Sequence, residues 1–334
     1  MKLTQKLLVG AVASLFATVG MAKGTLVYCS EGSPAGFDSA QYTAGTDFDA
    51  SSYNVFNGLV DFPRGESKAA PSLAESWDVS PDGLTYTFHL RKGVKFHTTK
   101  YFKPTRDFNA DDVVWTFERL ANKDFPFNKA YRVAFPYYSD MGLDTTIKSV
   151  EKVDDYTVKF NLNKVDASFI QTLAMAIASI QSKEYGDQLL AQGKAEMINQ
   201  QPIGTGPFQF ERYQKDAFIR YKANKDYWDK EDGPKVDNLI FAITKDASVR
   251  YQKLKAGECH IMAYPLPADV DSMKKDPSLQ VITSPGFNVG SLYYNTEKAP
   301  FDKAEVRQAL DYALNKPAII KAVYGGEGEQ AGEP

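Results

Sequence analysis

Apolar and polar residues alternate along several short segments of the chain, which is the pattern of half-buried β-strands. Residues 25–29 form the first such segment. In residues 85–90 the even-numbered positions are aromatic or aliphatic, whereas the odd-numbered positions are Thr or His. A Pro-Asp-Gly turn at 81–83 precedes that segment, and a similar strand–turn–strand pattern recurs at 147–162. The pattern therefore predicts a first strand and two hairpins.

Helical signals lie between and after these strands. Asn109 is followed by acidic residues and an apolar run, which is typical of a capped helix N-terminus. Residues 168–180 are apolar and compatible with a helix, and residues 248–256 end before Gly257. Residues 302–314 place apolar side chains along one helical face. Because strand and helix patterns mix along the whole chain, we predict an α/β (mixed α+β) fold.

Residues 1–22 have the features of a secretory signal peptide. Lys2 and Lys6 provide a positive start, residues 7–19 are apolar and small, and small residues precede a cut after Ala22. The apolar run is shorter than the ~20 residues that a membrane-spanning helix needs, so a cleaved signal is favoured over an anchor. We therefore expect a protein exported to the periplasm.

Composition and charge disfavour some classes of partner. The 334 residues contain 39 Lys and Arg against 42 Asp and Glu, so the formal net charge is −3. A nucleic acid or an anionic membrane surface would favour a basic patch, and the sequence contains no long run of like charge. We therefore expect no nucleic-acid partner. The hydrophobic content of 43% is sufficient for a sizeable core.

Two cysteines, Cys29 and Cys259, lie far apart in the sequence. In an oxidising compartment an even number of cysteines favours a disulfide, and two buried free thiols are the alternative. Neither cysteine belongs to a Cys-x-x-Cys pair, so no redox catalysis is expected. A lipid anchor on Cys29 is disfavoured because the bulky Tyr28 precedes it.

The sequence offers little support for catalysis or metal binding. The three histidines, His89, His97 and His260, do not have the spacing of metal ligands. The chain contains no Gly-x-Ser-x-Gly motif and no Walker A loop. Aromatic clusters at 135–138 and 292–294 could line a ligand cleft or pack in the core. We therefore expect a binding protein rather than an enzyme, with no catalytic residues, no metal and no cofactor.

Five segments in order along the chain resemble one protein family. They are 73–97, which ends in SPDGLTYTFHLRKGVKFH, and then 108–113, 202–208, 288–295 and 306–310. Together they resemble the bacterial extracytoplasmic solute-binding proteins of family 5, which supply ABC importers of peptides and nickel. Residues 25–34 and 245–251 are most similar to the dipeptide-binding branch. The resemblance extends over essentially all of residues 24–326.

The resemblance implies a two-lobed fold like that of type II periplasmic binding proteins, with an extra inserted subdomain. We expect the sheet domain of the first lobe at 23–53 and 204–284, the inserted subdomain at 54–203, and the start of the second lobe at 285–334. Members of the family continue well past the position of Pro334. The second lobe is therefore expected to be incomplete, and the chain to be a fragment.

The resemblance also implies a function. Such proteins bind di- or oligopeptides in the periplasm and deliver them, as monomers, to the inner-membrane permease of an ABC importer. Hinge closure of the two lobes buries the ligand. A related branch binds haem or glutathione, so both stay open as alternative ligands, with haem bound as a ligand rather than as a resident cofactor. A periplasmic hydrolase is a third and less favoured possibility.

Two residues are expected, by resemblance, to contact the ligand. Thr43 matches a cleft-facing threonine, and Phe135 matches a cleft-lining aromatic residue that is a tyrosine in the dipeptide-binding branch. The branch also has a disulfide at the positions of Cys29 and Cys259. The acid and the arginine that hold the two peptide termini belong to the second lobe and have no counterpart before Pro334. We therefore expect this chain to bind dipeptides weakly or not at all.

Overall fold

The computed structural model describes residues 24–283, 289–325 and 328–331, so the predicted signal peptide at 1–22 lies outside the described residues. A five-stranded sheet, here called the main sheet, has the strand order β11-β1-β10-β9-β8. Its strands are β1 (Thr25–Ser30), β8 (Phe208–Gln214), β9 (Phe218–Ala223), β10 (Asn238–Ile243) and β11 (Ile261–Met262). β1 runs parallel to both β10 and β11, whereas β8, β9 and β10 pair in antiparallel fashion.

A second sheet has four strands in the order β4-β5-β7-β6, all antiparallel. Its strands are β4 (Ala74–Val79), β5 (Thr85–Leu90), β6 (Ile147–Asp154) and β7 (Thr157–Leu162). Tyr86, Phe88 and Leu90 are buried, as the alternating pattern predicts for one face of β5. Both predicted hairpins are therefore confirmed. A short pair, β2 (Val60–Asp61) and β3 (Ala70–Pro71), lies nearby in sequence.

Helices cover both sheets. They are α1 (Gly45–Ala50), α2 (Ser52–Val55), α3 (Ala110–Ala121), α4 (Pro126–Ala130), α5 (Pro136–Asp140), α6 (Leu143–Thr146), α7 (Phe169–Leu173), α8 (Lys183–Ala191), α9 (Ala247–Lys255), α10 (Pro267–Lys275), α11 (Ala304–Ala313) and α12 (Lys316–Tyr324). The 3-10 turns are η1 (Ala176–Ala178) and η2 (Ala195–Asn199). At α3 the side chain of Asn109 accepts a hydrogen bond from the Asp111 amide, and Asp112 closes a capping box, so the predicted cap is confirmed. The mixture of sheets and helices confirms the mixed α/β class.

Residues 168–180, whose composition is compatible with a helix, are helical only in part. The chain forms the short helix α7, leaves the helical conformation at Met175, where ψ is 158°, and continues as η1. The Ile180 amide then donates a hydrogen bond to the Asn57 carbonyl. The end of this stretch is therefore paired with a distant segment of the backbone instead of continuing the helical hydrogen bonds. Residues with apolar side chains on every face lack the periodicity that marks a continuous helix.

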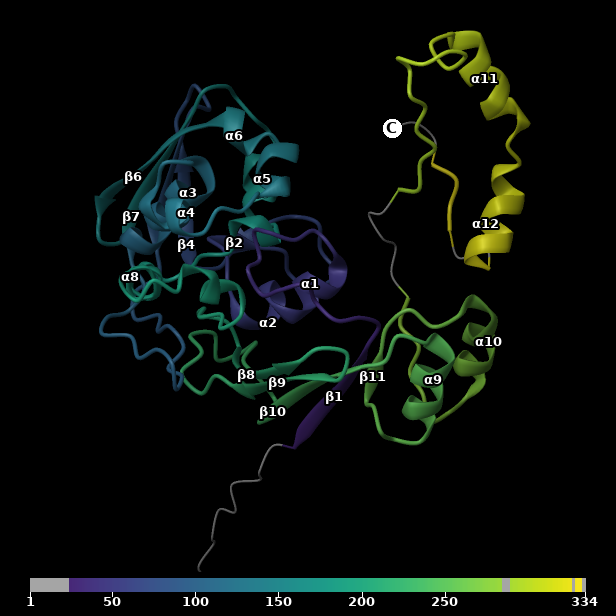
Figure 1. Cartoon of the computed structure of the whole chain (residues 1–334), viewed down its shortest axis with the longest axis horizontal. Helices are drawn as coiled ribbons and strands as arrows, with labels where there is room; N and C mark the ends of the chain where they lie inside the picture. The colour runs from purple at the N-terminus through teal and green to yellow at the C-terminus, as the bar shows by residue number, and fades with distance from the viewer. Residues whose placement is uncertain (1–23, 284–288, 326–327, 332–334) are drawn as a thin grey trace, which may run out of the picture.

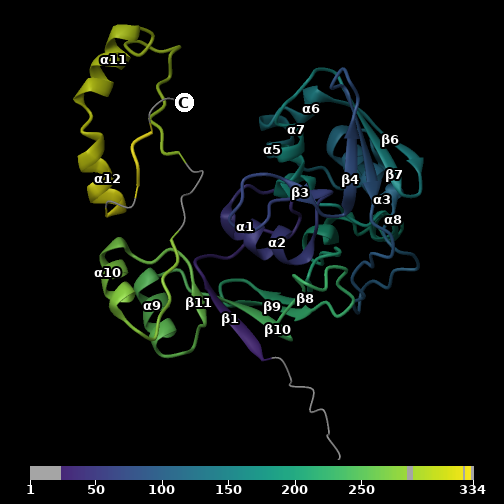
Figure 2. The same ribbon diagram turned by 180° about the vertical axis from the view of Figure 1, so that it is seen from behind.

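Two separate hydrophobic cores hold these elements. One lies around the four-stranded sheet and α3 and includes Phe88, Phe117 and Phe160, and the other lies over the main sheet and includes Phe37, Tyr221 and Phe241. α1 and α2 lie between the two sheets (Figures 1 and 2). In both views α9 and α10 flank the end of the main sheet where β11 lies, and α11 and α12 stand apart from the four-stranded sheet.

Candidate ligand-binding site

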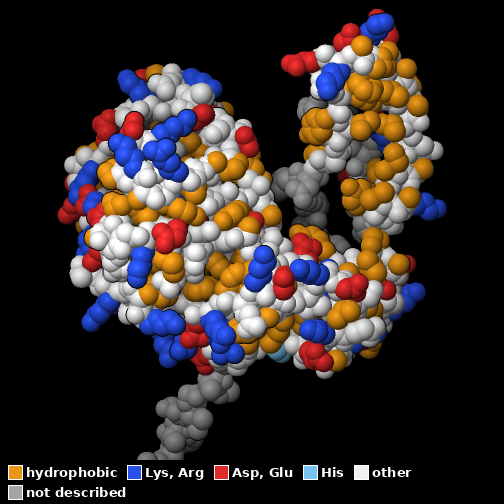
Figure 3. Space-filling view, viewed as in Figure 1, with side chains coloured by type: hydrophobic (Ala, Val, Ile, Leu, Met, Phe, Trp, Pro, Cys, Tyr) orange, Lys and Arg blue, Asp and Glu red, His pale blue; other side chains and the backbone are white. Residues whose placement is uncertain are grey.

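Thr43 and Phe135 come from different parts of the fold. Thr43 is exposed and lies two residues before α1, whereas Phe135 is half-buried and is the N-cap residue of α5. The predicted ligand contacts of both residues stay a prediction. Figures 1 and 2 place α1 and α5 on the side of the molecule that faces α11 and α12. Figure 3 shows an open hollow between the body that carries α1 and α5 and the part that carries α11 and α12.

The segments that carry these two residues are in contact with each other. Gln41 Nε2 donates to the Tyr131 hydroxyl at 3.2 Å. The ring of Phe48, in α1, lies 6.0 Å from the ring of Tyr137, in α5. The loop before α1 and the segment at the start of α5 are therefore in contact on the hollow side, and we call these two segments together the first-lobe wall (residues 38–44 and 131–137).

A buried ion pair joins the first-lobe wall to α3. Asp38 is completely buried, and Arg119, on α3, is 2% exposed. The Arg119 guanidinium donates through both terminal nitrogens to the Asp38 carboxylate. Gln181 bridges the pair, because its Nε2 donates to Asp38 at 3.0 Å and its Oε1 accepts from Arg119 at 3.0 Å. Burial acts to raise the pKa of Asp38, but the Arg119 charge and the hydrogen bonds outweigh it and lower that pKa below its usual value.

Asn199, at the end of η2, holds the backbone of the loop before α1, which carries Asp38 and Thr43. Its Oδ1 accepts hydrogen bonds from the amides of Phe37 at 2.9 Å and Asp38 at 3.0 Å, and its Nδ2 donates to the Tyr42 hydroxyl at 2.8 Å. Asp38, Arg119 and Asn199 were not among the residues predicted from the sequence. The available signal was Arg119 itself, a cation within the otherwise largely apolar buried face of α3.

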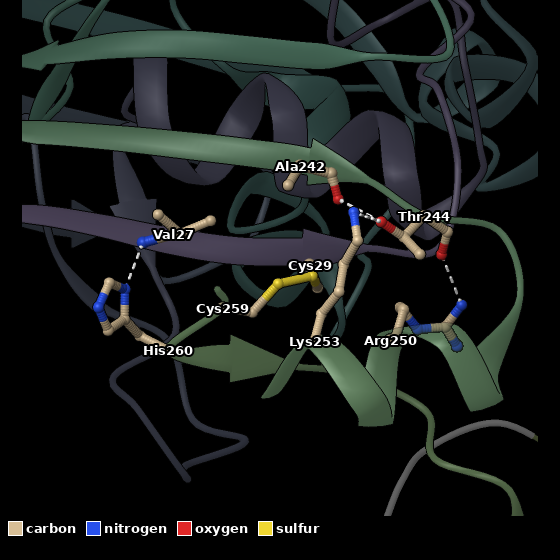
Figure 4. The surroundings of a disulfide bond; sticks show 8 residues. All are labelled: Val27, Cys29, Ala242, Thr244, Arg250, Lys253, Cys259 and His260. Carbon is tan, nitrogen blue, oxygen red and sulfur yellow. Dashed lines mark hydrogen bonds between the residues drawn. A yellow bond between two sulfur atoms is a disulfide. The ribbon is translucent and has the colours of Figure 1, made fainter. Parts of the chain in front are cut away.

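The two cysteines are joined in a disulfide that ties β1 to the start of β11. The Cα atoms of Cys29 and Cys259 are 5.8 Å apart, across 230 residues of sequence. The next residue, His260, accepts a hydrogen bond from the Val27 amide on its Nδ1 at 2.9 Å, as Figure 4 shows. The edge strand β11 is therefore held by side chains in addition to its two backbone pairings with β1.

Arg250 anchors the chain that leaves the main sheet. Its side chain is 3% exposed and donates to the carbonyls of Thr244 at 2.9 Å, Lys245 at 2.8 Å and Tyr264 at 3.0 Å. Tyr264 has a φ of 51°, in the left-handed region that non-glycine residues rarely adopt. Figure 4 shows the contact with Thr244 at the carboxyl end of β10, and the bond to Tyr264 joins this end to the segment that follows β11.

Two surface pockets lie elsewhere, and neither includes Thr43 or Phe135. A pocket of about 290 Å³ is bounded by α3, α4 and α8 over Trp115. A pocket of about 330 Å³ lies between residues 98–101 and the edge strand β8. Within 24–283, 289–325 and 328–331, no group of three or more His, Cys, Asp or Glu residues could hold a metal ion. In the same residues, no helix is long and apolar enough to cross a membrane.

The three histidines occupy three unrelated environments. His97 is buried, and its Nε2 lies 2.8 Å from the Gly206 carbonyl. His89 is exposed and lies 2.8 Å from a carboxylate oxygen of Asp78 on the neighbouring strand. His260 contacts the Val27 amide as described above. These contacts account for each imidazole as a structural or surface group.

Comparisons with known proteins identify relatives over almost the whole chain. The chain is 65% identical to di/tripeptide-binding protein 1 of Pseudomonas aeruginosa over 97% of its length. It is 53% identical to the dipeptide-binding protein of Escherichia coli over 98% of its length, and 50% identical to haem-binding protein A of Haemophilus influenzae over 93%. It spans 59%, 60% and 56% of the lengths of these three relatives, respectively.

Solved structures of periplasmic binding proteins have the same fold. A binding protein of an ABC transporter from Helicobacter pylori, in complex with the peptide STSA, aligns with a TM-score of 0.84 at 38% identity over 91% of this chain and 59% of that one. A dipeptide-binding protein from Pseudoalteromonas, in complex with Met-Leu, aligns with a TM-score of 0.84 at 36% identity over 90% of this chain and 59% of that one. These alignments confirm the type of two-lobed fold that the resemblance predicts. The family model described as bacterial extracellular solute-binding proteins, family 5 middle, matches residues 68–334, and the chain belongs to this family.

Proposed function

We propose that this chain binds short peptides and serves as the substrate-capturing component of an ABC importer. The observation that carries the proposal is the first-lobe wall, where the exposed Thr43 and the half-buried Phe135 come from two segments in contact on the hollow side. A hydroxyl and an aromatic ring on adjoining segments suit a peptide, because the hydroxyl can bond the peptide backbone while the ring contacts an apolar side chain.

The named relatives support a peptide ligand. Three proteins of 63–65% identity are called di/tripeptide-binding or dipeptide-binding proteins. A structural neighbour of 36% identity holds the dipeptide Met-Leu. Peptide binding is therefore favoured over the other ligands known for proteins that share this fold.

Several further features belong to the same proposal. We propose export through cleavage after Ala22, residence in the periplasm, and delivery of the peptide by a monomer to an inner-membrane permease. We also propose the division into a sheet domain at 23–53 and 204–284, an inserted subdomain at 54–203 and the start of a second lobe at 285–334. Binding takes place without turnover and without a resident cofactor.

The proposal is tested by titrating the purified 334-residue chain with Met-Leu and monitoring the titration by nuclear magnetic resonance. Asp38 is buried and paired with Arg119, so Arg132 is the one exposed charge among residues 38–44 and 131–137. Because an exposed ion pair contributes little, we expect weak binding with a Kd of about 1 mM, or about −4 kcal/mol. The changes in chemical shift should be largest in residues 38–44 and 131–137. Phe135→Leu should weaken binding about fivefold through loss of the ring, whereas Thr98→Ala, at an exposed threonine outside the wall, should not change it.

Two results would contradict peptide binding at this wall. One is the absence of shifts in 38–44 and 131–137 at saturating peptide. The other is an equal effect of Phe135→Leu and Thr98→Ala on the Kd. Release of free amino acids from Met-Leu by the pure protein would instead support a hydrolase.

Haem is the second candidate ligand, and a specific observation favours it. One relative of 50% identity is named a haem-binding protein. Addition of haemin to the chain should leave its Soret band at the position of free haemin if peptides are the ligand. A shifted Soret band that Met-Leu does not reverse would replace the peptide proposal with haem binding. Glutathione, the third alternative, is tested as a competitor in the peptide titration.

A further inference from the structure

Arg119 is a fully buried cation on α3 that contacts the first-lobe wall. We propose that Arg119 and Asp38 act as a positioning pair that sets Thr43 and Phe135 in register with each other for ligand binding. The inference rests on the proposed function as far as the ligand is concerned. Asp38 and Arg119 lie 81 positions apart in the chain, and their ion pair joins α3 directly to the loop that follows β1.

On one side, the pair fixes the orientation of Phe135. The centre of the Arg119 guanidinium lies 4.9 Å from the ring centroid of Phe135 and 5.4 Å from that of Phe127. Both distances are within the range of a cation–π contact, which is strongest when the cation is desolvated. Phe135 is the N-cap residue of α5, so the position of its ring is linked to the start of that helix.

On the other side, the pair fixes the loop that carries Thr43. Asp38 accepts hydrogen bonds from the Ala40 amide at 3.3 Å and from Gln41 Nε2 at 2.8 Å. Gln41 also donates to the Tyr131 hydroxyl, which belongs to the same segment as Phe135. The Asp38 carboxylate is therefore connected through Gln41 to Tyr131, and so to both segments of the first-lobe wall.

Stability alone does not account for this pair. Replacing a buried ion pair with apolar residues of similar volume is often neutral or stabilising, because burial removes both charges from water. The Arg119 Nε, in addition, is buried and has no hydrogen-bond partner. A directional contact can, however, specify one arrangement among several that apolar packing would permit, and that is the effect we assign to the pair.

A second ion pair, between Arg106 and the first turn of α3, provides a control. Arg106 contacts Asp112 at 2.7 Å, and the Asp112 carboxylate is completely buried. Asp112 belongs to the capping box at the start of α3, and its carboxylate accepts hydrogen bonds from Arg106, Asn109 and Lys183, which lie outside the first-lobe wall. Arg106→Met thus removes the partner of a buried carboxylate at the start of α3 while leaving the contacts of Asp38 and Phe135 in place.

Hydrogen–deuterium exchange and peptide affinity together test the proposal on the whole 334-residue chain. The variants are Arg119→Lys, the double variant Asp38→Leu with Arg119→Met, and the control Arg106→Met. In both pair variants we expect exchange in 38–44 and 131–137 to become about tenfold faster, and the Kd for Met-Leu to rise about tenfold, or about 1.4 kcal/mol. In Arg106→Met both quantities should stay at their wild-type values even if global stability falls.

Each outcome either supports or overturns the positioning role of Asp38 and Arg119. Unchanged exchange and unchanged Kd in Arg119→Lys would overturn the proposal, as would an equal change in Arg106→Met. If the double variant does not fold, Arg119→Lys is judged by the same two readouts. If the wild-type chain does not bind Met-Leu, the proposed function fails for this chain, whereas exchange in the ligand-free protein still decides whether the pair orders the wall.

Discussion

His97 makes the folded state sensitive to acid. Its side chain is 1% exposed, and its Nε2 contacts the Gly206 carbonyl at 2.8 Å. Burial lowers the pKa of His97 from 6.5 to about 4, although the hydrogen bond to Gly206 acts in the opposite direction. The imidazole is therefore neutral in the folded protein at pH values where it is charged in the unfolded chain.

The sign and size of the effect follow from proton linkage. Between the folded and unfolded pKa values, the unfolded state binds more protons, so the free energy of unfolding falls as the pH falls. A difference of about 2.5 pKa units corresponds to about 3 kcal/mol, and about 2 kcal/mol of this is already lost at about pH 5. Asp47, Asp49 and Asp61 have raised pKa values caused mainly by burial, and they act in the opposite direction. The comparison must therefore be between wild type and variant.

Urea unfolding monitored by circular dichroism provides the measurement. His97→Gln retains a side-chain donor for the Gly206 carbonyl but does not titrate. We expect the difference in unfolding free energy between wild type and His97→Gln to shift by about 2 kcal/mol in favour of the variant between about pH 7 and about pH 5. Thr98→Ala, at an exposed residue that does not titrate, is the control and should not produce this shift. Parallel pH profiles of wild type and His97→Gln would refute the reasoning.

Two further predictions concern other contacts that hold the fold. Replacing both Cys29 and Cys259 with alanine should lower the free energy of unfolding by about 5 kcal/mol in the chain-entropy treatment of a loop of 230 residues, as urea unfolding can measure; a loss below 1 kcal/mol would count against the bond. Gly204→Ala should destabilise the protein by about 2 kcal/mol, because a Cβ there would lie 2.0 Å from the Val55 carbonyl oxygen. Gly45→Ala meets no atom within 4 Å and serves as its control in thermal unfolding, where equal melting temperatures would contradict the prediction.

The features that the sequence predicts correctly are local. The hairpins at 75–90 and 147–162 follow from alternation and turn residues, and the helix at Asn109 follows from its cap, so each depends on a few neighbouring residues. Gly257, placed after a predicted helix, has a φ of 72° in the structure, which is the conformation that favours glycine there. The stretch at 168–180 has no such local signal, and its conformation is decided by the surfaces that surround it.

The candidate site depends on contacts that no local pattern encodes. Thr43 and Phe135 were selected by resemblance, and the ion pair at the first-lobe wall joins residues 81 positions apart. An arginine within an apolar helix face indicates a buried partner, but a sequence with 42 acidic residues does not say which one. The cysteine pair is different, because with two cysteines in the chain only one intramolecular pairing exists.

The contacts within each hydrophobic core and the contacts between the two cores have different effects. Apolar contacts within a core stabilise the fold, whereas polar contacts between the cores position segments for ligand binding. Apolar burial is non-directional, so each core can form without fixing how one sheet lies against the other. Polar contacts cross the boundary between them: Asp38 with Arg119, Asn199 with the Phe37 amide, and His97 with the Gly206 carbonyl. These bonds have defined lengths and angles, so they set how the segments around the two cores lie relative to each other. The contacts of Arg119 and Asn199 with Asp38 act on the loop of the first-lobe wall. Substitutions at this boundary should therefore change ligand affinity more than substitutions of equal cost to stability within either core.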